Sequence, residues 1–253
     1  MEIHRCDRLV STCIGAGHVE THFAQTGVNV IAHDMDCNVV NLWNQLAKNV
    51  QSVQDEFEAL RAKVRGETDR RRFFKEAHKT IMQQQAQAGT MTAEDAARFV
   101  VAKWMCFKGM LASKSSFWEK GCELLLSLDA SIITQYKGLQ MEVYRQDIFQ
   151  KISSAKVTDM IFVDPPYLVD EMGEQQYLAG PDFDYNTHKR LRDALEKHSG
   201  PWALCHRDDS RVRKLYKGFR IQKLKPIMTI SKKSAKRHEL LILSLGTAVQ
   251  TNR

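Results

Sequence analysis

Residues 51–129 contain no proline and almost no pattern of strands, so the fold must accommodate a long helical segment. The segment is rich in Gln, Glu, Lys, Arg and Ala, which favour or tolerate helix. Breaks are expected near the glycines at 66, 89 and 109, because glycine weakens a helix. The sequence therefore predicts several helices that together form an insertion in a larger fold.

The flanking parts of the chain alternate between apolar runs and segments with helical spacing. We expect strands at 8–12, 28–32, 139–144, 160–163, 202–205, 219–224 and 240–245, and helices at 18–25, from 38, at 184–198 and at 208–217. Alternating strands and helices indicate a mainly parallel sheet, and the short last connection indicates an antiparallel hairpin. The predicted fold is α/β and Rossmann-like, with residues 1–50 and 130–253 in one domain and 51–129 as the helical insertion.

Composition favours an anionic partner. The net charge is +7, and two basic clusters lie at 61–79 and 223–237. Nucleic acid is the first candidate. The chain has neither an apolar run long enough to cross a membrane nor the start of a signal peptide, which predicts a cytoplasmic protein, and no His or Cys cluster has zinc spacing.

The run Met160 to Val163 ends abruptly at the tetrapeptide Asp164-Pro165-Pro166-Tyr167. An apolar run that stops at proline is typical of a buried strand, and ligands bind at the carboxyl ends of such strands in α/β sheets. The Asp164 carboxylate and a proline carbonyl can accept hydrogen bonds from the exocyclic amine of a flat ring, while Tyr167 stacks on the face of that ring. The alternative is a plain proline turn. The tetrapeptide is a candidate slot for an amino-bearing base.

A glycine turn, Gly15 and Gly17, follows the first strand, and Asp34 follows the second. In this context glycines let the backbone approach a ligand, and the acid accepts ribose hydroxyls. The full dinucleotide fingerprint is absent, because Glu20 stands at the third glycine position, and no phosphate-binding loop is present. A nucleoside without a pyrophosphate, such as S-adenosylmethionine, suits the turn.

Together these motifs resemble those of the Dam-type DNA adenine N6-methyltransferases. Ser11 to Gly17 is similar to that family's F-x-G-x-G strand, although Cys13 replaces the phenylalanine. The segment 107–110 resembles its F-N-G-[LM] segment, and Tyr177, Phe183, His188 and Leu191 repeat its spaced Y, F, H and L. The resemblance implies cofactor contacts from Ile14, Gly15, Ala16, Gly17, Asp34 and Asp147, and catalysis by Asp164, Pro165, Pro166 and Tyr167.

The chain departs from the family at three places. The Gly-Gly-Lys segment upstream of the first strand, whose lysine faces the cofactor carboxylate, is absent, and Arg5 or Arg8 are candidate substitutes. The glycine- and asparagine-containing hairpin of the insertion is replaced by 112–118. Cys205-His206 stands where the family has Ser-Asn.

The expected function is methyl transfer from S-adenosylmethionine to the amino nitrogen of adenine in DNA, most simply double-stranded, after base flipping. Asp164 would act in its ordinary ionised state. Two alternatives are an RNA base methyltransferase and a nucleic-acid-binding protein that has lost catalysis. The setting would be a bacterial or phage-infected cell, with or without a restriction partner. Candidate nucleic-acid contacts are Lys108, Lys232, Lys233, Lys236 and Arg237.

Overall fold

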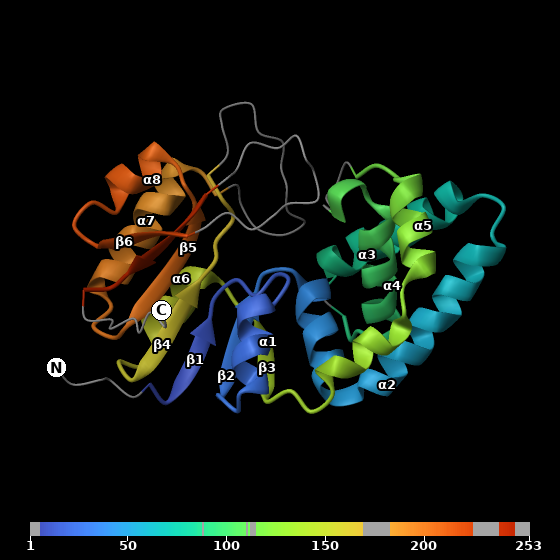
Figure 1. Ribbon diagram of the computed structural model, residues 1–253, viewed down its shortest axis with the longest axis horizontal. Helices are drawn as coiled ribbons and strands as arrows, with labels where there is room; N and C mark the ends of the chain where they lie inside the picture. The colour runs from blue at the N-terminus through green and yellow to red at the C-terminus, as the bar shows by residue number, and fades with distance from the viewer. Residues whose placement is uncertain are drawn as a thin grey trace.

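A computed structural model of the chain has a seven-stranded sheet beside a group of helices (Figure 1). It describes residues 6–87, 89–109, 111, 115–168, 183–224 and 238–245. The strand order is β3-β2-β1-β4-β5-β7-β6. The strands are β1 (Arg8–Ser11), β2 (Val30–Asp34), β3 (Met141–Arg145), β4 (Asp159–Val163), β5 (Trp202–Arg207), β6 (Arg220–Leu224) and β7 (Glu239–Leu243).

Strands β1 to β5 pair in parallel, and of the seven described strands β7 alone runs in the opposite direction. In the centre, Val10 of β1 pairs in parallel with Ile31 of β2 and Ile161 of β4. Strand β7 is inserted between β5 and β6 and is antiparallel to both. The parallel ladder aligns the carboxyl ends of β1, β2, β3 and β4 at one edge of the sheet, where a ligand site is expected.

Both faces of the sheet are covered. Strand β4 contributes side chains to the core on each face. Its side chains alternate between faces, so Phe162 belongs to the core cluster that includes Ala24 of α1 (His18–Gln25), whereas Ile161 and Val163 belong to the second core cluster. Helix α1 lies on the first side. Helices α6 (Ile148–Ser154), α7 (Tyr185–Lys197) and α8 (Ser210–Leu215) lie on the second.

The helical insertion packs beside the β3 edge of the sheet (Figure 1). It contains α3 (Arg70–Gln87), α4 (Ala93–Met105), the short 3-10 helix η1 (Phe107–Gly109), α5 (Glu119–Ser127) and most of α2 (Cys37–Gly66). The 3-10 helix η2 (Ala130–Tyr136), which follows the expected end of the insertion at residue 129, packs against α2. Helix α4 is its centre, since Phe99 and Met105 are buried there. Thr92 and Asp95 begin α4 with a capping box, which satisfies backbone donors that the first turn leaves free.

The sequence predicted this arrangement with local errors. The sheet, its antiparallel end and the helical character of the insertion are confirmed. Strand β2 begins two residues later than expected, at Val30, and α6 was not predicted because seven residues are too few for a helical period to show. The expected boundary after residue 50 falls inside α2, next to Asn49, whose φ of −135° and ψ of 42° kink the helix.

Candidate active site

A pocket of about 620 Å³ opens at the carboxyl ends of the parallel strands. The helical insertion forms one wall and the sheet forms the other. The lining residues come from six places in the chain: the turn after β1 (Thr12 to Ala16), the end of β2 with the start of α2 (Asp34 to Asp36, Val39), α4 and the segment after it (Phe99, Lys103, Gly109, Leu111), the start of α6 (Asp147 to Phe149), the tetrapeptide (Asp164 to Tyr167) and the α7 region (Phe183, Thr187, Arg190).

The glycine turn is held from both sides. The amide of Gly15 donates to Asp34 Oδ2 at 3.0 Å, and Trp43 Nε1 donates to the carbonyl of Gly15 at 3.0 Å. Gly17 has a φ of +66°, and a Cβ there would lie 2.4 Å from Trp43 Cζ2. Gly15, at φ +44°, would place a Cβ in open space. Glycine is therefore needed at position 17 by the turn conformation and by the close approach of Trp43, whereas Gly15 faces the pocket.

Two carboxylates in the pocket are fixed by backbone amides. Asp34 accepts from the amides of Gly15 and Asp36, one on each oxygen, at 3.0 and 2.9 Å. Asp147 caps α6 through Oδ1, which accepts from Phe149 and Gln150 at 2.9 and 3.2 Å. Each oxygen of Asp34 can accept a second bond, and Asp147 has its Oδ2 for a ligand, so both acids retain capacity for a hydroxyl or amino group.

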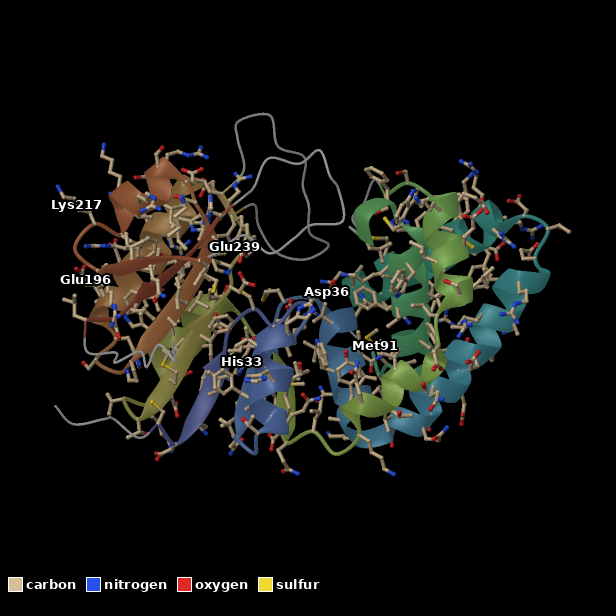
Figure 2. The ribbon with its side chains drawn as sticks, in the orientation of Figure 1. His33, Asp36, Met91, Glu196, Lys217 and Glu239 are labelled. Atoms are coloured by element: carbon tan, nitrogen blue, oxygen red, sulfur yellow. The ribbon has the colours of Figure 1, made fainter. Side chains whose placement is uncertain are left out.

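Asp164 stands at the end of β4 and is exposed to solvent on its pocket side. The surrounding protein raises its pKa to about 6, first by desolvation and then through the negative charge of Glu239. This pKa is higher than the ordinary value expected from the sequence. The cause is tertiary, because Glu239 begins β7, far along the chain (Figure 2).

Tyr167 contacts both Glu239 and His206. Its hydroxyl donates to Glu239 Oε1 at 3.4 Å, and its ring centroid lies 4.8 Å from that of His206 at an interplanar angle of 35°. Desolvation and the charges of Asp164 and Glu239 raise its pKa, so the hydroxyl stays protonated. Tyr167 lines the pocket, and its ring packs against the ring of His206.

The end of β5 holds the tetrapeptide loop in place. His206 Nε2 accepts from the amide of Leu168 at 3.0 Å, and Arg207 Nη2 donates to the carbonyl of Leu168 at 2.9 Å. The other ring nitrogen of His206, Nδ1, lies 2.8 Å from the carbonyl of Arg207, so the proton sits on Nδ1. His206, at the second position of the Cys205-His206 departure, thus anchors the backbone immediately after Tyr167.

A model of the family described as "D12 class N6 adenine-specific DNA methyltransferase" matches residues 2–230. The chain belongs to this family. One similar solved structure is described as the methyltransferase domain of bacterial CtHen1-CN; it is 7% identical, with 95% of this chain and 91% of that chain covered and a TM-score of 0.37. A comparison with curated proteins finds no match.

Membership of the D12 family settles the class of enzyme. The chain is an adenine-specific DNA methyltransferase. In the part of the chain that the structure describes, no helix is long and apolar enough to cross a membrane.

Most of the residues that sequence reasoning selected in this D12 methyltransferase lie in one pocket. Ile14, Gly15, Ala16, Asp34, Asp147 and Asp164 to Tyr167 all line it, and Gly17 lies behind it against Trp43. Lys108 belongs to η1, next to the lining residue Gly109, and its side chain is outside the described residues. The remaining candidates, Lys232, Lys233, Lys236 and Arg237, also lie outside the described residues, as does Tyr177.

Sequence reasoning missed several charged residues of the pocket region. Lys103 and Arg190 line the pocket, and Glu239 approaches Tyr167 from β7. Lys103 lies shortly before the 107–110 segment and Arg190 lies between His188 and Leu191, but neither is a motif position, so no motif marked them. Glu20 was noticed only as a missing glycine; it is 2% exposed and accepts a hydrogen bond from the Ser11 hydroxyl.

Proposed function

We propose that this enzyme transfers a methyl group from S-adenosylmethionine to the exocyclic amino nitrogen of an adenine flipped out of double-stranded DNA. The observation that carries the proposal is a single pocket lined by the glycine turn, Asp34 and the whole Asp164 to Tyr167 tetrapeptide. A cofactor and a base bound in one pocket can be brought into direct contact, which transfer without a covalent enzyme intermediate requires.

The donor and acceptor groups of the pocket fit the proposed cofactor. Asp34 retains acceptor capacity for ribose hydroxyls and Asp147 for an adenine amino group. Met35 and Ile148 supply apolar surface for a purine ring, and the open space at Gly15 leaves room for close backbone approach. When bound, the cofactor supplies the electrophilic sulfonium methyl group.

The tetrapeptide then acts on the amine. The lone pair of an adenine amino nitrogen is delocalised into the ring, which makes it a weak nucleophile. Asp164 and the Pro165 carbonyl accept its two N–H bonds and favour a pyramidal nitrogen, by positioning and electrostatic stabilisation. After transfer the nitrogen carries an extra proton, and Asp164, with a pKa of about 6, accepts it more readily than an ordinary aspartate would.

Tyr167 supports the flipped base. Extruding a base costs about a few kcal/mol, and stacking on an aromatic side chain returns about 1–3 kcal/mol. Because the Tyr167 ring lies against His206 and its hydroxyl is bonded to Glu239, the stacking surface is already oriented. Preorganisation of this kind lowers the cost of binding the base.

The test uses purified protein, S-adenosylmethionine with a labelled methyl group, and mixed-sequence duplex DNA. Wild type should form N6-methyladenine, whereas Asp164→Ala should lose transfer by at least about 100-fold while cofactor affinity, measured by calorimetry, stays within about threefold. Asp164→Asn serves as the matched control, because it keeps the shape and one acceptor oxygen but cannot take up the proton. Cofactor binding by wild type without methyladenine would refute the reaction and favour a binding protein.

A further inference from the structure

The proposed cofactor brings a carboxylate into a pocket whose own charges are mostly negative. Asp34, Asp36, Asp147 and Asp164 line it together. These acids suit the cationic sulfonium and amino groups of S-adenosylmethionine but repel its carboxylate. A cation must therefore face that end of the ligand, and the glycine turn, Asp34, Asp147 and the tetrapeptide contain none.

Arg8, one substitute that the sequence suggested, is committed elsewhere. Its guanidinium forms two hydrogen bonds with the buried Asp159, Nε to Oδ1 at 2.7 Å and Nη2 to Oδ2 at 3.1 Å. Arg8 begins β1, and the pocket lies at the opposite end of that strand. Removing it from Asp159 would leave a buried charge unpaired, which is costly. The other suggestion, Arg5, lies outside the described residues.

Two cations of the described chain do line the pocket, and they lie toward different parts of it. Arg190 projects from α7, and its guanidinium carbon lies 4.4 Å from the centroid of the Phe149 ring. Phe149 follows Asp147 at the start of α6, so Arg190 belongs to the part of the pocket assigned to the adenine ring. An arginine stacked on an aromatic ring is well placed to flank a base.

Lys103 comes from the other wall. It lies in the last turn of α4, with Nζ 5.3 Å from the centroid of the Phe99 ring, and lines the pocket beside Asp34, Asp36 and Leu111. Within the described residues it forms no salt bridge, although Asp36 and Asp34 act on its charge from a distance. Desolvation outweighs these two acids and lowers its pKa, so a close anion would relieve an existing cost.

We propose that Lys103 binds the carboxylate of S-adenosylmethionine, an inference that rests on the proposed function. The helical insertion then contributes to the cofactor site a cation that the glycine turn, Asp34 and the tetrapeptide lack. A DNA phosphate is the other anion that a lysine could meet. Asp34 and Asp36 beside Lys103 disfavour it, because a polyanion would have to approach two carboxylates to reach the ammonium group.

The experiment compares two ligands that differ only in the carboxylate: S-adenosylmethionine and its decarboxylated form. Their dissociation constants are measured by calorimetry for wild type, Lys103→Met and Lys103→Arg. Lys103→Met should weaken S-adenosylmethionine by about 10- to 100-fold, as expected for a lost charged hydrogen bond, and change the decarboxylated ligand by less than about threefold. Lys103→Arg should recover most of the lost affinity.

Controls separate this inference from its alternatives. Arg190→Met should not discriminate between the two ligands, and Lys48→Met, at an exposed position of α2 away from the pocket, should affect neither. Equal loss of both ligands in Lys103→Met, or loss of DNA affinity alone, would overturn the inference while leaving methyl transfer intact. Absence of S-adenosylmethionine binding by wild type would instead overturn the proposed function, and this inference with it.

Discussion

At the scale of residues, the chemistry depends on acids whose surroundings have changed their proton affinity. Asp164 has a pKa raised to about 6 and Glu20 one raised to about 7, in each case chiefly by desolvation. The charge of Asp164 also contributes to raising the pKa of Glu20. The tetrapeptide is therefore a titrating site near neutral pH.

Methyl transfer should fall as the pH is lowered through about 6. Asp164 must be ionised to accept hydrogen bonds from the amine, and below its pKa the protonated carboxyl group loses that role. The measurement is single-turnover methylation of duplex DNA from about pH 5 to about pH 8.5, at saturating cofactor. The transfer rate should drop about tenfold for each pH unit on the acid side.

Glu239→Gln is the matched variant for this profile. It removes one negative charge beside Asp164 while keeping an acceptor for the Tyr167 hydroxyl, so the acid limb should shift to lower pH. A profile that stays flat to about pH 5 in wild type would contradict an ionised Asp164 as acceptor.

At the scale of elements, the site is assembled from turns that secondary-structure ends place side by side. The glycine turn follows β1, Asp34 ends β2, Asp147 caps α6 and the tetrapeptide follows β4. The carboxyl ends of parallel strands converge, so acids from distant segments meet without a long loop. The backbone conformation of the turn is the part that tolerates least change.

Gly17→Ala should cost more stability than Gly27→Ala. Both glycines have positive φ, +66° and +83°, so both alanines carry a similar backbone strain of about 1 kcal/mol. At Gly17 the added Cβ also meets the Trp43 ring, and Trp43 holds the Gly15 carbonyl, whereas nothing lies within 4 Å of a Cβ at Gly27. We expect an additional loss of about 1–3 kcal/mol at Gly17, together with weaker cofactor binding.

Denaturant unfolding of both variants measures the difference, and calorimetry measures the cofactor affinity. Gly27→Ala serves as the control for strain alone, since it lies at the end of α1 and does not line the pocket. Equal losses of stability in the two variants would show that Trp43 moves aside without cost and that the turn is not held as described.

At the scale of the whole molecule, two parts of the chain share one pocket. Strands β1 to β4 supply acids and the tetrapeptide, while α4 of the insertion supplies Phe99 and Lys103. Behind the pocket, Glu20 of α1 joins Ser11 of β1 in the interior. The buried acid makes the stability of the fold dependent on pH.

The Glu20 carboxyl should reduce stability as the pH rises. Its pKa is raised from 4.5 to about 7 on folding, so the folded state binds its proton more tightly than the unfolded state does. The stabilisation is present below about pH 4.5 and is lost as the pH rises to about 7, a change on the order of 3 kcal/mol. Glu20→Gln should abolish this loss and be the more stable protein at about pH 8.

Urea unfolding at several pH values measures this dependence as the difference between wild type and Glu20→Gln. The difference is needed because His33 and His188, whose pKa values are lowered to about 4, act in the opposite direction over part of the same range. Parallel pH curves for the two proteins would contradict a buried, shifted Glu20.

The sequence by itself determined the features that depend on neighbouring residues. Glycines after a strand, an apolar run before Asp164-Pro165 and a proline-free helical segment are local patterns, and they predicted the sheet, the insertion and the residues of one pocket. Periodicity reports which face of an element is buried, so the elements followed from it. It does not report which distant element lies across that face.

Only the tertiary structure decided the features that depend on distant partners. It inserted β7 between β5 and β6, which brought Glu239 to Tyr167 and raised the pKa of Asp164. It also placed Lys103 beside Asp34 and buried Glu20 against Ser11. Desolvation and charge interactions act through space, between residues far apart in the chain, so no local pattern encodes them.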